Sequence, residues 1–345
     1  MTGPHDEMTQ VWITGPETVE VRRVPVPEPG PGEVLVATAY AGICGSDLHT
    51  LRRGHPWLPY PIRPGHEASG LTVAVGAGVT AFAPGDPVYL RPAVACGDCF
   101  YCGRGKENLC VNLVGIGSHR PGAFADAFTV PVAALARVPG GVSLTAAAMI
   151  EPLATAVHAT GIAGPLSGAT VAILGGGSIG QSVLLAARAA GAAAVVVTDP
   201  VPGKRDLASG LGATATFDPA GPALSAGIRT ALDGRPDVVF DCVASAASLG
   251  DAVDLATRGG RVVVVGVGHG PLTVAIETIQ DQEVSVAGSA MYLPADFAAA
   301  ERLVAAGGAV ERLVTATRPL TDARAALAAA GAGADVKIQL TGPAA

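Results

Sequence analysis

The 345-residue chain contains little charge, since Asp, Glu, Lys and Arg make up only 15% of it while hydrophobic residues make up 49%. That balance excludes an intrinsically disordered chain. The length is sufficient for two domains with a sizeable core. The net charge is −7, and no run of Lys or Arg occurs. A nucleic-acid partner is therefore not expected.

The sequence also lacks a leader pattern and an unbroken hydrophobic span. The segment Met1–Glu7 has no basic region followed by an apolar core, so we expect no signal peptide. Residues 152–187 carry no formal charge, but Gly161, Gly164 and Gly168 interrupt them. We therefore expect a helix, a strand and a second helix there rather than a membrane span. The default expectation is a soluble cytoplasmic protein with reduced thiols.

Cysteine is scarce, with six in the chain, yet four of them fall within one stretch of residues 96–110. Their spacing, C-x2-C-x2-C-x7-C, leaves open disulfides, an iron–sulfur site and a zinc site. Disulfides are disfavoured in a reducing compartment. An iron–sulfur site would typically place its fourth cysteine sooner. We favour a structural zinc site with four thiolate ligands, which leaves no position for a substrate. Its ligands would be Cys96, Cys99, Cys102 and Cys110.

Two regions differ in their local pattern. Residues 1–150 contain short β-like runs such as Glu33–Thr38, separated by Pro and Gly turns, and predict a loop-rich β domain. After Glu151 apolar strands alternate with helices, which predicts βαβ units and a parallel sheet. We expect strands at 170–174, 193–198, 237–243 and 261–266, and helices at 179–190, 204–211, 246–257 and 296–306.

A glycine-rich turn follows the first expected strand of the second region. Residues 175–180 fit the pattern G-x-G-x-x-G, with a strand before them and a helix after them. Such a turn places a pyrophosphate at the helix N-terminus. Gly175 permits the tight turn, Gly177 lets the backbone approach the phosphates, and Gly180 lets the helix pack on the strand. We therefore predict a dinucleotide site, which also includes Ser178 and Ile179.

An acidic residue ends the next expected strand. Asp199 can accept hydrogen bonds from ribose hydroxyls and would repel the 2′-phosphate of NADP, which favours NAD. The basic residues nearby leave NADP open, and an ordinary turn aspartate before Pro200 is the alternative interpretation. We assign three further residues to the same cofactor site: Lys204, Val265 and Gly266.

A second set of metal-binding residue types is spread along the chain as Cys44, His66, Glu67 and Glu151. A thiolate, an imidazole and a carboxylate leave zinc an open position when water fills the fourth site. Each residue also has an ordinary interpretation: a small buried hydrophobe, a core or surface histidine, and a glutamate that starts a helix.

Together these pieces resemble the zinc-containing medium-chain dehydrogenase/reductase superfamily from about Val34 to about Val336. The pieces are Gly42–His49, the Gly65–Gly70 segment, the four-cysteine stretch and the glycine turn with Asp199. The resemblance implies an α/β fold in which a GroES-like β-barrel catalytic domain accompanies a Rossmann domain with a doubly wound parallel sheet. It implies a catalytic domain at 1–155, a Rossmann domain at 156–290 and a return to the catalytic domain at 291–345.

The resemblance also implies individual roles. Cys44 and His66 match catalytic zinc ligands, and Glu151 takes the place of a third ligand that is a cysteine in many alcohol dehydrogenases. This acidic residue makes the chain more similar to sorbitol, butanediol and threonine dehydrogenases. Glu67 matches a glutamate that coordinates zinc or lies just behind it. The remaining roles are an orienting carboxylate and a proton relay: Asp47 for the first, Ser46 and His49 for the second.

The implied activity is a zinc-dependent transfer of hydride between NAD and a secondary alcohol, such as a polyol, sugar, cyclitol, vicinal diol or amino alcohol. Two zinc ions per chain and a homodimer or homotetramer are expected, with Glu283–Gly288 as a candidate sheet edge. A zinc-independent quinone or enoyl reductase and a non-catalytic NAD-binding sensor are the alternatives. The full ligand set argues against the first, and the intact Ser46 and His49 argue against the second.

Overall fold

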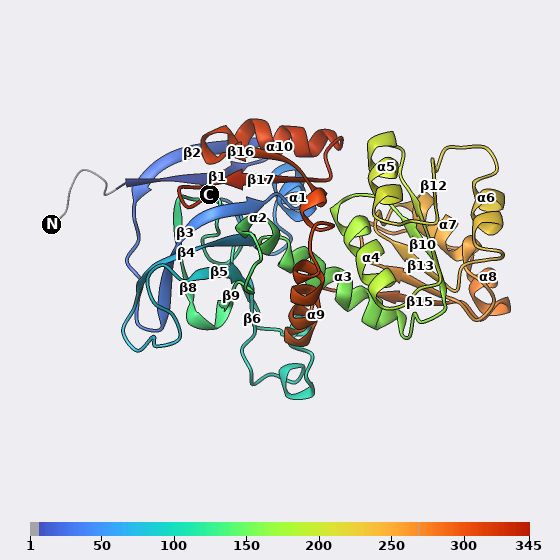
Figure 1. The fold of residues 1–345 in the computed structure, drawn as a ribbon, viewed down its shortest axis with the longest axis horizontal. Helices are drawn as coiled ribbons and strands as arrows, with labels where there is room; N and C mark the ends of the chain where they lie inside the picture. Colours follow the sequence, from blue (N-terminus) through green and yellow to red (C-terminus); the bar gives the residue numbers. More distant parts are fainter. Residues whose placement is uncertain (1–6, 269) are drawn as a thin grey trace. The chain divides into compact units, whose positions relative to one another are not determined.

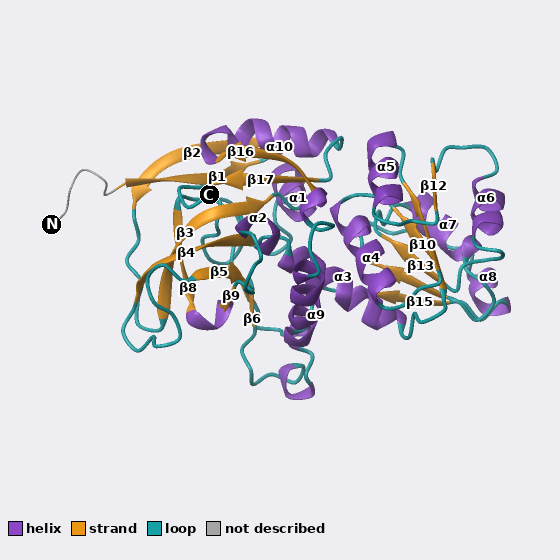
Figure 2. Cartoon of the chain, in the orientation of Figure 1, coloured by secondary structure: helices purple, strands orange, loops and turns teal. Residues whose placement is uncertain are grey.

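The computed structural model describes residues 7–268 and 270–345 (Figures 1 and 2). Most of the segment that bears on a signal peptide, residues 1–6, lies outside them. The chain forms two compact units, one from the residues up to Glu151 together with Val304–Ala345, the other from Pro152–Leu303. The sequence placed these divisions at 155/156 and 290/291. Helix α9 (Pro294–Ala305) accounts for the later second division, because Phe297 and Ala300 are buried and Asp296 bonds His158.

The first unit is built on a seven-stranded sheet. Its order is β16 (Val314–Pro319), β17 (Lys337–Thr341), β3 (Glu33–Gly42), β4 (Glu67–Val75), β5 (Pro87–Leu90) and β9 (Leu135–Arg137), with β8 (Ala127–Pro131) also paired to β3. A hairpin of β1 (Glu7–Gly15) and β2 (Thr18–Pro25) lies outside this sheet. The core contains Val36, Leu90, Phe124, Phe128 and Leu340, all nearly inaccessible to solvent.

The end of the chain joins the sheet of the first unit. Strand β17 pairs antiparallel with β3, with Gln339 opposite Gly42, and β16 pairs with β17. Helix α10 (Ala323–Ala332) precedes β17 and buries Ala323, Ala326 and Leu327 in the same core. The return that the family resemblance implied is thus built by strand pairing between segments about 300 residues apart.

The first unit also contains short helices. They are α1 (Gly45–Arg53), α2 (Leu144–Ala147) and the one-turn segments η1 (Cys102–Arg104), η2 (Glu107–Leu109), η3 (Val132–Ala134), η4 (Glu311–Leu313) and η5 (Leu320–Asp322). Strands β6 (Ala93–Val94) and β7 (Val114–Gly115) pair at the base of the cysteine-rich segment. The two ends of the cysteine-rich segment are therefore held together by this strand pair.

The second unit contains a six-stranded parallel sheet. Its order is β12 (Ala215–Phe217), β11 (Ala194–Thr198), β10 (Thr170–Leu174), β13 (Val238–Asp241), β14 (Arg261–Val264) and β15 (Ser285–Gly288). Its helices are α3 (Ile150–Ala163), which begins at the division between the units, α4 (Ser178–Ala189), α5 (Pro202–Gly210), α6 (Leu224–Ala231), α7 (Ala246–Leu255), α8 (Ile276–Asp281) and α9. This is the doubly wound order, with the direction of winding reversed between β10 and β13, where such folds bind ligands.

The predicted alternation of strands and helices is confirmed, with ends shifted by a few residues. Residues 152–187 form most of α3, then β10 and most of α4, so the uncharged stretch is helix, strand and helix. The sequence did not predict the short strand β12 or helix α6. Among helices in the described ranges, none has both the length and the apolarity needed to cross a membrane.

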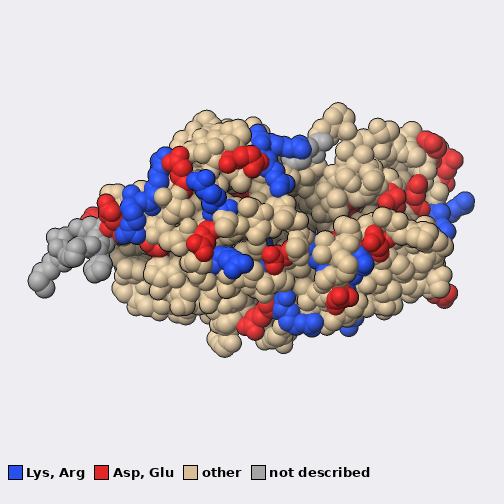
Figure 3. Space-filling view, turned by 90° about the horizontal axis from the view of Figure 1, so that it is seen from above, with Lys and Arg blue, Asp and Glu red and all other residues tan. Residues whose placement is uncertain are grey.

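Charged side chains on the face seen in Figure 3 are of mixed sign, because Lys and Arg groups lie beside Asp and Glu groups. Within the first unit, ion pairs join Arg22 to Glu20 at 2.6 Å and Arg137 to Asp86 at 2.8 Å. This visible face is therefore not dominated by charge of one sign.

Candidate active site and cofactor site

Three of the predicted catalytic-metal ligands converge in the first unit. One ligand atom from each of Cys44, His66 and Glu67 lies within 4.8 Å of the other two. Cys44 is the N-cap of α1, Glu67 is the first residue of β4, and His66 immediately precedes that strand. A thiolate, an imidazole and a carboxylate at this separation fit a zinc ion, because all three are its usual ligands.

Backbone geometry before His66 depends on a glycine. Gly65 has φ +104°, and a Cβ there would lie 2.8 Å from the amide nitrogen of Ala123. The amide of Ala123 in turn donates to the carbonyl of Gly65 at 2.8 Å. Only glycine lets the chain turn into β4 against this neighbouring segment, and the turn delivers His66 to the metal group.

Asp47 orients two of the ligands. Its Oδ2 accepts a hydrogen bond from the amide of Cys44 at 2.9 Å, and its Oδ1 lies 3.7 Å from Nδ1 of His66. A proton on Nδ1 is favoured by that carboxylate, so Nε2 is the ring nitrogen that loses its proton when a metal binds. Burial alone would lower the pKa of His66, but the charges of Asp47 and Cys44 raise this pKa well above its usual value.

Ser46 and His49 both lie on α1, and Ser46 contacts the metal group. The Oγ of Ser46 is 3.5 Å from Nε2 of His66. His49 follows Ser46 by three residues and therefore lies on the same face of the helix. Two hydroxyl or imidazole groups at this spacing can pass a proton along the helix surface.

The sequence analysis missed Lys337, which forms a buried ion pair with Glu67. Its Nζ lies 2.8 and 2.5 Å from the two carboxylate oxygens and donates to the carbonyl of Ile43 at 3.0 Å. Side-chain exposure is 2% for Lys337 and 1% for Glu67. Burial lowers the pKa of Lys337, but Glu67 more than compensates and the net shift is upward. A lysine 270 positions from its partner gives no local sequence signal.

Glycine also makes room for this ion pair. Gly42 on β3 is directly opposite Glu67 in the strand register, and a Cβ at Gly42 would overlap Oε2 of Glu67. Strands β3, β4 and β17 thus cooperate to hold the carboxylate beside Lys337. The fourth predicted ligand, Glu151, is buried in the first turn of α3. It lies outside the three-residue ligand group, although its charge contributes to the raised pKa of His66, after burial and the larger effects of Asp47 and Cys44.

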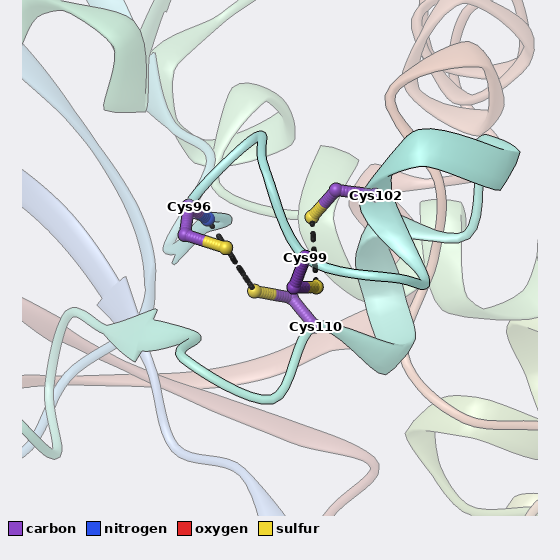
Figure 4. Close-up of side chains that lie close together, drawn as sticks. All are labelled: Cys96, Cys99, Cys102 and Cys110. Atoms are coloured by element: carbon purple, nitrogen blue, oxygen red, sulfur yellow. Dashed lines mark hydrogen bonds between the residues drawn. The ribbon is translucent and has the colours of Figure 1, made fainter.

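The four clustered cysteines form a second group with ligand atoms within 4.8 Å of one another (Figure 4). The Sγ atoms of Cys96 and Cys110 are 3.4 Å apart, and those of Cys99 and Cys102 are 3.5 Å apart. These separations are far longer than a disulfide bond of about 2.05 Å. They are close to the ~3.8 Å edge of a tetrahedron with Zn–S bonds of about 2.3 Å. The thiols therefore fit one zinc ion.

Thiol acidity in this group suits metal binding. Backbone N–H groups of Cys102 and Val111 lower the pKa of Cys99 to about 6, whereas burial raises the pKa of Cys102 to about 12. Of these two thiols, Cys99 is therefore the more readily deprotonated. A divalent cation would displace the remaining protons and neutralise the thiolates that replace them.

In the second unit the glycine motif joins β10 to α4 as predicted. Gly175 has φ +95°, and a Cβ at Gly180 would overlap the carbonyl oxygen of Gly175. These glycines bring the N-terminus of α4 close to the end of β10. In the described part of the chain, the buried Oγ of Ser178 at the first turn of α4 has no hydrogen-bond partner. An unsatisfied hydroxyl and the exposed amide ends of a helix fit a dinucleotide phosphate.

Asp199 lies directly beneath this motif. Its Oδ2 accepts a hydrogen bond from the amide of Gly176 at 2.9 Å, and its Oδ1 accepts one from the amide of Val201 at 2.8 Å. Arg205 donates to the carbonyl of Asp199 at 2.7 Å. Each carboxylate oxygen keeps a lone pair for a ribose hydroxyl. Lys204 lies in the first turn of α5, and its carbonyl accepts a hydrogen bond from Nε2 of Gln181 at 2.9 Å.

A loop completes this edge of the sheet, where the sequence analysis wrongly extended a strand to residue 243, because β13 ends at Asp241. Residues 242–244 follow β13, and Gly175 is close enough to them that a Cβ would lie 2.8 Å from Val243. Gly266 approaches the same loop, since a Cβ there would lie 2.7 Å from the carbonyl carbon of Val243. Amides of Val265 and Gly266 donate to the carbonyl of Asp241. The predicted cofactor residues after β10 and β14 are thereby brought together around Val243.

Two family descriptions match the chain. Residues 30–140 match the alcohol dehydrogenase GroES-like domain, and residues 178–306 match the zinc-binding dehydrogenase family. The probable D-xylulose reductase A of Aspergillus niger is 32% identical over 342 residues, which cover 96% of this chain and 95% of that protein.

Solved structures share the whole architecture. A candidate zinc-binding dehydrogenase from Sinorhizobium meliloti, solved bound to NADP, has a TM-score of 0.91 at 34% identity and covers 97% of this chain and 99% of its own. An Escherichia coli alcohol dehydrogenase, solved with NADH, has a TM-score of 0.90 at 29% identity with the same coverage.

Proposed function

Because the chain belongs to the zinc-binding dehydrogenase family of medium-chain alcohol dehydrogenases, we propose that it oxidises one secondary hydroxyl of a polyhydroxylated substrate to a ketone with NAD. The observation that carries this proposal is the convergence of Cys44, His66 and Glu67, with Asp47 and Ser46 beside them. The D-xylulose reductase of A. niger supports a polyol substrate.

Zinc at the catalytic group would supply a Lewis acid for the substrate oxygen, and the nicotinamide would accept a hydride. We assign Cys44 and His66 as zinc ligands, with Glu67 and Glu151 as the carboxylates that complete or exchange at the site. Asp47 fixes the imidazole of His66 through Nδ1. The cysteine lobe, with Cys96, Cys99, Cys102 and Cys110, would hold the second zinc as a structural ion.

Ser46 and His49 would carry the proton. Oγ of Ser46 would accept the hydroxyl proton of the substrate and give its own proton to His49. His49 would then pass a proton to solvent, while the nicotinamide would take the hydride with its electron pair. The products are the ketone, NADH and one proton, so atoms and charge balance. The contact of 3.5 Å between Ser46 and His66 supports this placement of the hydroxyl.

We also propose the phosphate loop Gly175–Gly180, with Ser178 and Ile179, as the pyrophosphate site, and Asp199 as the ribose carboxylate that favours NAD over NADP. Lys204, Val265, Gly266 and the Val243 loop would border the same cofactor. The relatives bind both forms, since one was solved with NADP and one with NADH. The backbone N–H groups of Gly176 and Val201 donate to the carboxylate of Asp199, which supports a fixed, ionised carboxylate there.

Assembly and location belong to the proposal as well. Strand β15 is an edge of its sheet, and its Val286 is exposed, which supports pairing of two copies into a homodimer or a higher homo-oligomer. The described cysteines are all free, and both metal groups need thiolates, which supports a reducing, cytoplasmic location. Light scattering of the purified protein measures the oligomeric state, and fractionation of cell compartments measures the location.

One experiment tests the activity. Zinc in the purified protein is quantified, and NADH formation is followed with polyols, sugars, cyclitols and amino alcohols. We expect about two zinc ions per chain and turnover that a chelator abolishes. Ser46→Ala should keep the zinc content and NAD affinity while kcat falls about 10²–10⁴-fold. Turnover without zinc would favour a quinone or enoyl reductase, and two zinc ions without turnover would favour a sensor.

A further inference from the structure

A single ammonium group contacts both oxygens of the Glu67 carboxylate. The Nζ of Lys337 lies 2.8 Å from Oε1 and 2.5 Å from Oε2, and it donates to the carbonyl of Ile43 at 3.0 Å. Three acceptors within hydrogen-bond distance match the three hydrogens that an ammonium can donate. The ammonium is therefore held between one candidate metal ligand, Glu67, and the residue that precedes another, Cys44.

Strand β17 fixes where the lysine lies. Gln339, two residues further along the strand, points to the same face. It lies opposite Gly42 of β3, and its Nε2 donates to the carbonyl of Thr145 at 3.0 Å. Lys337 thus belongs to a paired strand, and its ammonium cannot follow a carboxylate that moves away from it.

Glu67 has little freedom in this position. A Cβ on Gly42, which is opposite Glu67 in the strand register, would overlap Oε2. Only 1% of the Glu67 side chain and 2% of the Lys337 side chain are exposed. A carboxylate buried this deeply needs a compensating positive charge, which water cannot supply. Lys337 supplies that charge here, and a metal ion bound by Cys44 and His66 would offer a second one.

One carboxylate is sufficient for the charge of the proposed catalytic zinc. Zinc with one thiolate, one neutral imidazole and one carboxylate has no net charge and keeps its fourth position open. The proposed site offers two carboxylates, Glu67 and Glu151, beside Cys44 and His66. If both bound at once, they would make the site anionic and fill the position that a substrate oxygen needs. One of them must therefore be kept off the metal, and both oxygens of Glu67 are engaged by Lys337.

We propose that Lys337 is a positioning residue that competes with zinc for the carboxylate of Glu67. While the ion pair is intact, Glu67 is held beside the metal group and the fourth position stays open for a substrate oxygen. This role rests on the proposed function and refines it, because Lys337 then determines whether Glu67 exchanges onto the metal.

Variants of the ion pair test this role, with zinc affinity measured by competition with a chelator. Lys337→Met removes the competitor, so the catalytic group should hold zinc about tenfold more tightly and kcat should fall about 10–100-fold. Addition of Glu67→Gln should reverse most of both changes, because no carboxylate then fills the open position. Lys337→Arg, which keeps the charge, should stay close to wild type. Arg318→Met removes an exposed cation from the neighbouring strand β16, and this matched control should change neither value.

A ligand titration reports on the open position without turnover. Cobalt replaces the catalytic zinc, because its visible absorption changes when a further ligand binds, and imidazole is the probe. In Lys337→Met about tenfold more imidazole should be needed for half of the spectral change, since it must displace Glu67. Lys337→Gln keeps a donor for Glu67 without the charge and should shift the titration in the same direction. It serves as the test where Lys337→Met does not fold.

Two outcomes contradict the role of Lys337 while the proposed function stands. One is a wild-type zinc affinity and imidazole titration in both Lys337→Met and Lys337→Gln. The other is weaker zinc binding that Glu67→Gln does not reverse, which is the result that a purely structural ion pair would give. Absence of turnover with every alcohol, together with the expected imidazole titrations, contradicts the proposed function alone.

Discussion

At the scale of single residues, the site depends on charges that are buried together. Glu67 and Lys337 are almost inaccessible to solvent. Removal of either side chain would leave the charge of the other buried and unpaired. Asp47 serves Cys44 and His66 at once through its two oxygens. Such groups are expensive to bury singly, and here Glu67 is paired with Lys337 and His66 with Asp47.

Lys337→Met is expected to lower the free energy of unfolding by about 3–5 kcal/mol, because it leaves the carboxylate of Glu67 buried and unpaired. Lys337→Arg should recover part of the loss. Urea denaturation of the metal-free protein measures the change. Arg22→Met breaks the exposed pair with Glu20 and should change stability far less. Equal effects of the two substitutions would contradict the account.

The raised pKa of His66 gives the metal-free protein a pH dependence. Its folded pKa exceeds the unfolded value of about 6.5, so the stabilisation by the protonated ring is fully present below that pH and is lost as pH rises through the folded pKa. Denaturation of chelated wild type and His66→Gln between about pH 5.5 and 9 isolates the effect. The difference between them should decline with rising pH; a constant difference would contradict it. Zinc affinity should rise over the same range.

At the scale of elements, two turns place the chemistry. The turn from β10 into α4 depends on Gly175 and Gly180, and the turn into β4 depends on Gly65. At Gly180 and Gly65 a backbone segment lies where a Cβ would otherwise be, and at Gly175 the side chain of Val243 does. The paired strands β6 and β7 close the cysteine lobe in the same way that a short hairpin is closed. These elements determine where ligands can bind, while their side chains determine what binds.

Gly180→Ala should displace α4 from β10, because the new Cβ overlaps the carbonyl oxygen of Gly175. We expect a loss of about 1–3 kcal/mol in stability and weaker NAD binding, as calorimetry would show. Gly250→Ala is the matched control, since Gly250 is inside α7 and a Cβ there meets no atom of the described chain within 4 Å. That control should gain about 0.5–1 kcal/mol.

At the scale of the whole molecule, strand order decides which distant residues meet. In the second unit β10 lies between β11 and β13, so the loops after these strands share one edge of the sheet. In the first unit β3 lies between β4 and β17, which brings Glu67 and Lys337 together. The topology therefore assembles each site from segments that are far apart in sequence.

Asp199→Ala tests the assembly at the edge of the parallel sheet. Loss of the carboxylate removes both the ribose contact and the repulsion of a 2′-phosphate, so the ratio of kcat/KM for NAD over NADP should fall about tenfold or more. Steady-state kinetics with the two cofactors measures the ratio. Asp218→Ala, which removes a weaker partner of Arg205 at 3.5 Å, should leave the ratio near its original value. An unchanged ratio in Asp199→Ala would remove Asp199 from this role.

The sequence alone predicted the parallel sheet, the glycine turn and the four-cysteine group, because their signals are local. Each of these patterns spans only a few dozen residues: the periodicity of strands and helices, the G-x-G-x-x-G turn and the C-x2-C-x2-C-x7-C spacing. Family resemblance was needed to join Cys44, His66, Glu67 and Glu151, and whether Glu67 or Glu151 binds zinc stays a prediction. Each of these residues has an ordinary structural interpretation when taken alone, so composition and spacing could not indicate that they share one site.

Only the tertiary structure brought Lys337 to Glu67 and His119 to His55. Both contacts depend on strand register and on where loops cross, which are set by the packing of the whole domain rather than by neighbours in sequence. A one-residue shift of β17 would turn Lys337 to the opposite face of its strand. The sequence thus determined the chemical class of each site, and the fold determined which side chains share it.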